Sequence, residues 1–255
     1  MRFVQLITVP ALLFLPSSAP AAGVPDDCKQ LIVAVAPSWD SMRGELQRFE
    51  RSGARHWQPV GQPVPVLFGK NGLAWGRGLA GQEEAGRRKK ERDGRAPAGV
   101  FRIGKIYTYD PALPTGAHFP FHQVTKADAW IDDPTRPDYN RHVTIDDPDN
   151  PPPWFAKEKM RHNDFAYRWL VEIRHNSDPP QPNEGSAIFF HIRRGESRPT
   201  SGCTTMAESA LVGLIKWLRA DAHPCYVLLP RALYDEKSAG WNLPATAPRA
   251  PRRKI

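Results

Sequence analysis

A histidine and a cysteine in the last third of the chain have the types and spacing of a base and a nucleophile. His191 ends the apolar run SAIFFH, and Cys203 follows in the motif PTSGC, 12 positions later (203 − 191 = 12). The loop between them contains Gly195, Pro199 and Gly202, so it can fold back. A histidine beside a thiol can deprotonate it and later protonate a leaving amine. The spacing fits equally well a buried, hydrogen-bonded histidine beside a structural cysteine.

The residues after Cys203 carry the signals of a helix start. Thr205 and Glu208 fit the Thr-x-x-Glu capping box, and apolar residues recur with helical spacing before Pro224. Cys203 would then lie two residues before the helix cap, where the partial positive charge of the helix favours a thiolate. We therefore expect a lowered pKa for Cys203. Backbone N–H groups from Gly202 onward would face an oxyanion.

Short apolar or alternating runs predict a mainly β fold with few helices to position these residues. The runs are 31–36, 64–69, 99–104 and 186–191, each bounded by glycine, proline or polar residues. Strict alternation of apolar and charged residues predicts a further half-buried strand over 165–173. The 27 Pro and 19 Gly of the chain indicate many loops and turns.

The chain divides into three parts by composition. Residues 1–22 resemble a secretory signal, with an apolar stretch that is shorter than the roughly 20 residues of a membrane span. We therefore expect export to the periplasm or cell wall and no integral membrane span after signal removal. Residues 23–236 are expected to form one domain with a Pro- and Asp-rich insertion at about 105–164. Residues 237–255 are expected to be a disordered, basic, Pro-rich tail.

The three cysteines of the chain allow one pair. Cys28 and Cys225 each lie at the start of an apolar run, near opposite ends of the domain. A disulfide between them would suit an exported protein and would leave Cys203 as the free thiol.

The net charge of +8 does not indicate a nucleic-acid partner, because the basic residues gather in weakly patterned segments. Residues 87–90 form one such cluster, which we interpret as a solvated loop. His118 and His122 are separated by Pro120 and lie outside any helical pattern, so we expect neither a metal site nor a cofactor.

The two motifs around the histidine and the cysteine are similar to those of a known family. SAIFFHIRRG followed by PTSGCTTM resembles the catalytic motif of the L,D-transpeptidase (YkuD-domain) family, in which a loop joins a strand-end histidine to Ser/Thr-x-Gly-Cys. Pro97, Gly99 and Phe101 match the family's Pro-x-Gly-x-Phe strand. VPVLFGKNGLAWGRGL, together with Tyr139 and Asn140, looks like a less studied branch of that family.

The resemblance implies an L,D-transpeptidase-like β-sandwich with the nucleophilic cysteine at the start of a helix. Cys203 would attack the carbonyl that follows the L-configured centre of a diamino acid in a peptidoglycan stem tetrapeptide. The terminal D-alanine would leave, and an amine of a second stem or water would resolve the thioester. His191 would be the base and acid, oriented by a backbone carbonyl near Ile192, and the N–H groups of Gly202 and Cys203 would hold the oxyanion. These roles belong to peptidoglycan biosynthesis, cell wall biogenesis and cell shape.

Two departures from the family pattern bear on the substrate. Ser201 stands where many members have a second histidine, and Thr205 stands where many have an arginine. Arg193, Arg194 and Arg198 are the candidates for binding substrate carboxylates, together with Ser201. The alternatives are an L,D-carboxypeptidase or hydrolase acting on the same substrate, and a non-catalytic wall-binding module of the same fold.

Overall fold

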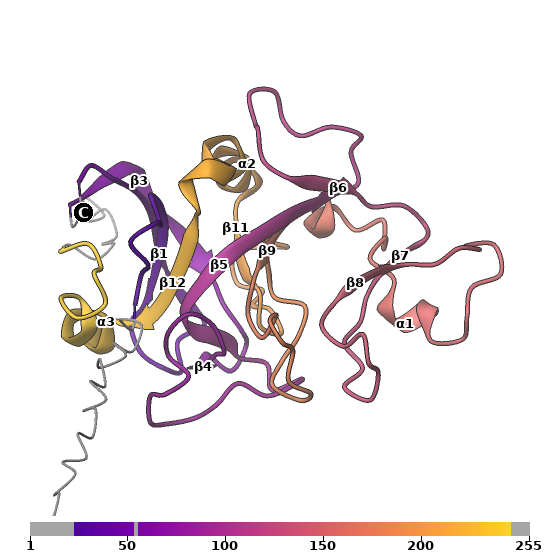
Figure 1. Ribbon diagram of the computed structural model, residues 1–255, viewed down its shortest axis with the longest axis horizontal. Helices are drawn as coiled ribbons and strands as arrows, with labels where there is room; N and C mark the ends of the chain where they lie inside the picture. Colours follow the sequence, from indigo (N-terminus) through magenta and orange to yellow (C-terminus); the bar gives the residue numbers. More distant parts are fainter. Residues whose placement is uncertain (1–22, 54–55, 246–255) are drawn as a thin grey trace, which may run out of the picture.

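A curved β-sheet forms the body of the protein. The computed structural model describes residues 23–53 and 56–245 (Figure 1). The expected signal segment, residues 1–22, lies outside the described residues.

The described residues form many strands, from 3 to 13 residues long, and few helices. The strands are β1 (Gln30–Ala36), β2 (Arg43–Arg51), β3 (Trp57–Leu67), β4 (Leu73–Trp75), β5 (Ala96–Thr108), β6 (Phe121–Gln123), β7 (Asp128–Trp130), β8 (His142–Thr144), β9 (Trp169–Ile173), β10 (Phe189–Ile192), β11 (Thr204–Met206) and β12 (Cys225–Pro230). The helices are α1 (Phe155–Glu158), α2 (Glu208–Trp217) and α3 (Arg231–Lys237), with 3-10 turns η1 (Phe165–Tyr167) and η2 (Ala220–Ala222). The expectation of a mainly β fold with few helices is confirmed.

Ten of the twelve strands in the described residues are joined in one sheet that closes on itself. The order is β12-β1-β2-β3-β11-β10-β9-β5-β4, with β6 on β5. β12, at one end of this path, pairs in parallel with β1 and also antiparallel with β5, which is next to the other end, so the sheet closes. Closure leaves few free strand edges. This continuous pairing differs from the two separate packed sheets of the expected β-sandwich.

The centre of the body is built from strands that are buried on both faces. Every residue of β1 and of its partner β12 is buried, which explains why both read as continuous apolar runs in the sequence. Helix α2 covers part of the sheet through Leu211, Leu214 and Ile215, which are its buried residues. The apolar side chains of these elements belong to the largest core cluster.

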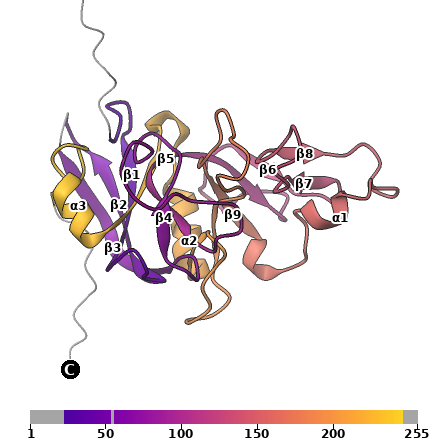
Figure 2. The same cartoon turned by 90° about the horizontal axis from the view of Figure 1, so that it is seen from below.

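The Pro- and Asp-rich insertion extends from one end of the sheet. Strand β6 continues the main sheet, whereas β7 and β8 pair only with each other as a two-stranded sheet. Ala129, Ile131 and Phe155 form a small core of their own there. Figures 1 and 2 show this region with helix α1 projecting away from the main body. The strand β5 continues to Thr108, so the insertion begins later than expected.

The helix after Cys203 begins later than the capping box predicts. Thr205 lies in strand β11, where it is paired with His191 and Leu67, and α2 begins only at Glu208. Ala207 is the N-cap and provides no side-chain hydrogen bond. The predicted capping box and the placement of the cysteine at a helix start are therefore wrong, because strand pairing on both sides of Thr205 determines its conformation.

Two other expectations also need correction. The strand predicted over 165–173 begins at Trp169, and η1 precedes it with Asp164 as its N-cap, accepting a hydrogen bond from the Ala166 N–H at 2.9 Å. In the segment expected to be a disordered tail, Trp241 and Leu243 are buried in the main core. A disordered tail is therefore wrong for residues 237–245, and residues 246–255 lie outside the described part of the chain.

Candidate active site

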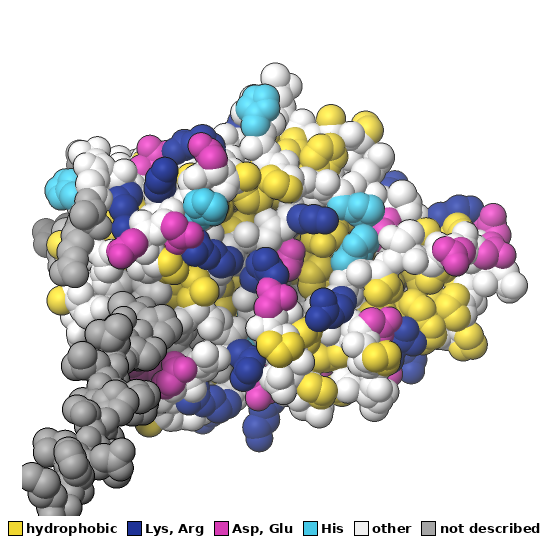
Figure 3. Space-filling model, in the orientation of Figure 1, with side chains coloured by type: hydrophobic (Ala, Val, Ile, Leu, Met, Phe, Trp, Pro, Cys, Tyr) yellow, Lys and Arg dark blue, Asp and Glu magenta, His cyan; other side chains and the backbone are white. Residues whose placement is uncertain are grey.

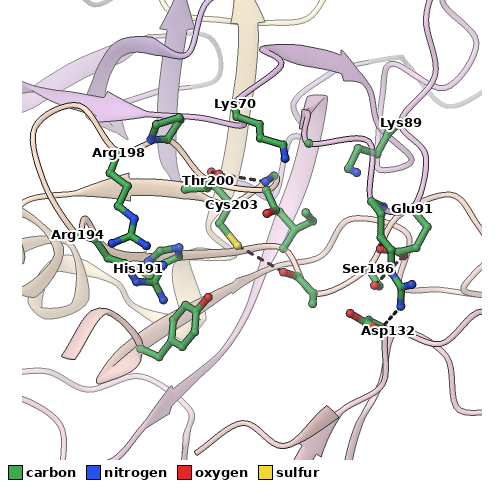
Figure 4. Close-up of a pocket in the computed structure, with 18 residues that line it drawn as sticks. Lys70, Lys89, Glu91, Asp132, Ser186, His191, Arg194, Arg198, Thr200 and Cys203 are labelled. Carbon is green, nitrogen blue, oxygen red and sulfur yellow. Dashed lines mark hydrogen bonds and ion pairs between the residues drawn. The ribbon is translucent and has the colours of Figure 1, made fainter. Parts of the chain in front are cut away.

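The parallel pairing of β10 and β11 places His191 and Cys203 on the same face of the sheet. Phe190 is opposite Thr204 and His191 is opposite Thr205. Cys203 precedes Thr205 by two residues, so its side chain points to the face that His191 occupies. Figure 4 shows both side chains at one cavity, which both residues line. The structure therefore brings the predicted pair together through a strand rather than through a helix terminus.

The imidazole of His191 is held in one orientation by a backbone carbonyl and an aromatic ring. Its Nδ1 donates to the backbone carbonyl of Ile192 at 2.9 Å, and its ring meets the ring of Tyr167 edge to face at 5.1 Å between centroids. In the neutral ring, Nε2 then carries the lone pair. The side chain is only 2% exposed, and burial lowers the pKa of His191 to about 4. The orienting carbonyl near Ile192 is confirmed.

Cys203 is a neutral thiol in this environment. Its Sγ lies 3.5 Å from the carbonyl oxygen of Ala187. Burial raises the pKa of Cys203 to about 11, although the backbone of Phe189 and the charges of Lys89 and Arg194 favour the thiolate. The expected lowering of this pKa is therefore wrong, because desolvation of the sulfur outweighs nearby positive charge. The resting pair is a thiol beside a neutral imidazole.

We expect the alkylation of Cys203 by iodoacetamide to report this neutral state. The rate should keep rising above pH 8.5, the ordinary range of a cysteine, because the thiolate population grows only as the pH approaches about 11. Mass spectrometry of the labelled peptide separates Cys203 from the other cysteines. A rate that is already level between pH 6 and 8 would show a thiolate–imidazolium pair instead.

The loop before Cys203 is fixed by Thr200. The Thr200 hydroxyl accepts from the Gly202 N–H at 3.0 Å and donates to the Cys203 carbonyl at 2.6 Å. The Lys70 N–H donates to the Thr200 carbonyl at 2.8 Å and ties the loop to the end of β3. A Cβ on Gly202 would lie 3.0 Å from the carbonyl oxygen of Arg95, so only glycine fits without adjustment. Of the two predicted oxyanion donors, the Gly202 N–H is thus already bonded.

A cavity of about 630 Å³ opens beside Cys203 and carries excess positive charge (Figure 4). Its charged lining residues are Lys70, Lys89, Arg92, Arg194, Arg198, Glu91 and Asp132. Five cations against two carboxylates suit an anionic ligand. We call this space the first cavity.

Three of the four predicted substrate-binding residues line the first cavity. Ser201, Arg194 and Arg198 do so, whereas Arg193 does not and forms an ion pair with Glu196. The expectation that Arg193 binds substrate carboxylates is therefore not supported by its position.

The cations of the first cavity differ in how far they are already neutralised. Arg194 pairs with Asp164 at 2.5 Å and stacks on the ring of Tyr167 at 4.6 Å. No ion pair is found for Lys70 or Arg198 within the described part of the chain, so these two are the most available for a carboxylate.

Two lysines of the first cavity do not follow from the sequence. No motif marks Lys70, and Lys89, expected in a solvated basic loop, is 4% exposed and pairs with Asp93 at 2.6 Å. Residues 87–90 are all basic, so their sequence gives no signal of which side chain points inward.

A second cavity, of about 210 Å³, meets the first one at Cys203. It is lined by residues of the insertion, including Trp130, Asp132 and Glu158, and by Phe189 of β10. Cys203 and Asp132 line both cavities. Cys203 therefore lies where the two cavities join.

Asn140 connects the insertion to the cysteine. Its Oδ1 accepts from the Trp130 indole N–H and from the Ala187 N–H, both at 3.0 Å. Its Nδ2 donates to the carbonyls of residues 175 and 176 at 3.0 and 2.6 Å. Since Ala187 contacts the sulfur of Cys203, Asn140 fixes part of the wall of both cavities. In the sequence, only the family resemblance draws attention to Asn140.

Replacing Asn140 with alanine should destabilise the protein by about 3 kcal/mol, because several buried polar groups lose their partners. Urea unfolding of the wild type and the variant measures the difference. Asn183→Ala is a matched control, since Asn183 is exposed and has a similar positive φ of 67° against 56° for Asn140. Equal losses in the two variants would show that backbone conformation, and not the buried hydrogen bonds, accounts for the effect.

Cys28 and Cys225 lie beside each other but away from both cavities. Both are buried free thiols in the structure. Contact with the Cys28 thiol, together with burial, raises the pKa of Cys225 well above its usual range. The disulfide between them stays a prediction.

A family model provides an independent identification. The model of the L,D-transpeptidase catalytic domain, YkuD, matches residues 57–227. The chain belongs to this family. The match includes His191, Cys203 and the insertion, so the L,D-transpeptidase domain contains the whole candidate site. A search of curated proteins found no match to the chain.

Within the described residues, no helix has the length and apolar character needed to cross a bilayer.

Proposed function

We propose that this L,D-transpeptidase-family domain is an exported cysteine acyltransferase acting on peptidoglycan stem peptides. One observation carries the proposal: Cys203 and an imidazole anchored through its Nδ1 share one face of a sheet, at the junction of two cavities. Family membership supports an enzyme of this type. The residues 1–22 support the proposed location in the periplasm or cell wall, where peptidoglycan is assembled.

The proposed chemistry starts from the neutral pair. As Sγ of Cys203 attacks the carbonyl carbon of the donor peptide, Nε2 of His191 takes the thiol proton. The imidazolium then donates that proton to the nitrogen of the departing D-alanine, and a thioester remains on Cys203. An amine of a second stem attacks the thioester, His191 accepts the amine proton, and the thiol is restored. Each proton moves during bond formation, because neither a resting thiolate nor a resting imidazolium is favoured.

The charges of the two cavities support separate places for donor and acceptor. The first cavity has excess positive charge, and Lys70 and Arg198 are available for the carboxylates of a donor stem. The second cavity is lined by Asp132 and Glu158 together with Lys157 and Lys159, and its two carboxylates can attract a cationic amine. We therefore place the donor in the first cavity and the acceptor amine in the second. The N–H of Cys203 is the proposed donor to the oxyanion.

Incubation with purified disaccharide tetrapeptides tests the proposal. We expect release of free D-alanine and formation of cross-linked dimers, both measured by chromatography with mass spectrometry. Release of D-alanine with tripeptides as the only products would show carboxypeptidase chemistry, with water as the acceptor. Retention on isolated cell walls without any D-alanine release would contradict the enzyme and support a wall-binding module.

A further inference from the structure

Three side chains with metal-binding atoms converge on the insertion, outside both cavities. They are His122 in β6, Asp128 in β7 and His142 in β8. The Nε2 atoms of the two histidines lie 2.8 and 2.7 Å from the same carboxylate oxygen, Oδ1 of Asp128. One ligand atom from each residue lies within 4.8 Å of the others. In the sequence, the histidine nearest to His122 is His118. In the fold, the side chain of His122 instead lies beside that of His142.

The carboxylate of Asp128 is oriented by its neighbours. It is 1% exposed, and its Oδ2 accepts from the N–H and the hydroxyl of Thr125 at 2.6 and 2.7 Å. The Thr144 hydroxyl donates to Oδ1 at 3.0 Å. A carboxylate oxygen therefore faces the two imidazoles, held by the kind of surrounding hydrogen bonds that orient metal ligands.

The two imidazoles are packed but remain accessible. Their ring centroids are 4.6 Å apart, and both rings contact Tyr107 of β5, at 5.9 Å for His122 and 5.1 Å for His142. The side chains of His122 and His142 are 35% and 20% exposed. Figure 3 shows histidine side chains on the surface in the region of β6 and β8. An ion can therefore reach the cluster from solvent, and a water molecule can complete its coordination.

We propose that His122, Asp128 and His142 bind one zinc ion. Two imidazole nitrogens and one carboxylate oxygen suit zinc and similar transition metals, whereas calcium and magnesium prefer oxygen ligands. Zinc bonds of about 2.0–2.1 Å in a tetrahedral arrangement separate the ligand atoms by roughly 3.3 Å. The imidazoles must therefore move about 0.5 Å from the carboxylate, and each Nε2 must give up its proton as the ring takes the Nδ1–H form. Water supplies the fourth ligand.

The position of the cluster indicates a structural role for the ion. β6 belongs to the main sheet through β5, whereas β7 and β8 form the separate sheet of the insertion. A shared ion would fasten the insertion to the main sheet. Trp130, also in β7, packs against Tyr107 and Phe189 and lines the second cavity. Zinc binding would thus stabilise one wall of that cavity without contacting the reacting atoms.

Calorimetric titration with zinc chloride tests the site in Cys203→Ala protein, which lacks both the thiol that lines the cavities and the proposed activity. We expect one zinc ion per chain, a higher melting temperature with zinc and no such rise with magnesium. His142→Gln should weaken zinc binding at least about tenfold, because it removes an imidazole and keeps a hydrogen bond to Asp128. His56→Gln, which changes an exposed histidine outside the cluster, should bind zinc like its parent.

His122→Gln provides a second variant if His142→Gln fails to fold, and it should weaken zinc binding in the same way. Zinc affinity unchanged in the folded cluster variants, or no zinc bound by the parent, would overturn the proposal. Because the parent already lacks the nucleophile, the outcome is independent of the proposed enzyme function.

Discussion

Replacing Cys203 with alanine should abolish D-alanine release from stem tetrapeptides. The acyl group of the proposed reaction is held on this sulfur, and no other cysteine lines either cavity in the described part of the chain. The variant should remain folded, because Cys203 contributes only a partly buried side chain to the small core around Phe189. The assay compares the initial rates of D-alanine release by the wild type and the variant.

Cys28→Ala is the matched control for this substitution. Cys28 is fully buried in the main core and lies away from both cavities. The control should lose some stability and keep its activity per folded molecule. Residual D-alanine release by Cys203→Ala near the wild-type rate would rule out this residue as the nucleophile.

Replacing His191 with alanine should lower the rate of D-alanine release by about 10²–10⁴-fold, the usual contribution of a positioned general base and acid. The effect should be large because the thiol has a raised pKa and cannot supply a thiolate at neutral pH without a base. His56→Ala changes an exposed histidine and should leave the rate unchanged. A loss of less than about threefold in His191→Ala would contradict the assigned role.

The pH dependence of D-alanine release by the wild type should be set by His191. The base form of His191 is present above its lowered pKa of about 4 and is lost as the pH falls through that value. The rate of D-alanine release per enzyme at low substrate should therefore persist well below pH 6.5 and decline only near pH 4. A decline centred near pH 6.5, the ordinary value for histidine, would show that the imidazole is solvated in the working enzyme.

Much of the strand framework and the central pair could be predicted from the sequence. The apolar runs of β1, β5, β10 and β12 are short and bounded by turn residues, so their local pattern agrees with their tertiary environment. His191 and Cys203 were found because the motif combines a strand end, a loop and a cysteine. The family match and their shared face in the fold agree with that interpretation.

The environment of Cys203 could not be predicted from local pattern. Thr205 and Glu208 fit a capping box, but pairing of β11 with β10 and β3 decides the conformation of Thr205. The raised pKa of Cys203 depends on burial by segments distant in sequence. Cys203 directly precedes strand β11 and not a helix, so the pKa lowering expected at a helix N-terminus does not apply to it.

The insertion was the least predictable region for the same reason. Its prolines and its paired acidic residues, at 132–133 and 146–147, are typical of turns and lie outside the helices and strands. Asn140, Asp128 and His142 nevertheless act as buried or half-buried hydrogen-bonding residues whose partners are remote in sequence. No periodic pattern marks such residues, because their positions depend on side-chain contacts rather than on repeated burial.

The intact mass of the protein after exposure to a carbapenem tests the central claim most directly. A carbapenem presents a strained acyl group that an enzyme of this family is expected to open and hold as a thioester. The wild type should gain the mass of one drug molecule on the peptide that contains Cys203, and Cys203→Ala should gain none. A wild type without any adduct, or an equal adduct on Cys203→Ala, would contradict the assignment of Cys203 as the nucleophile.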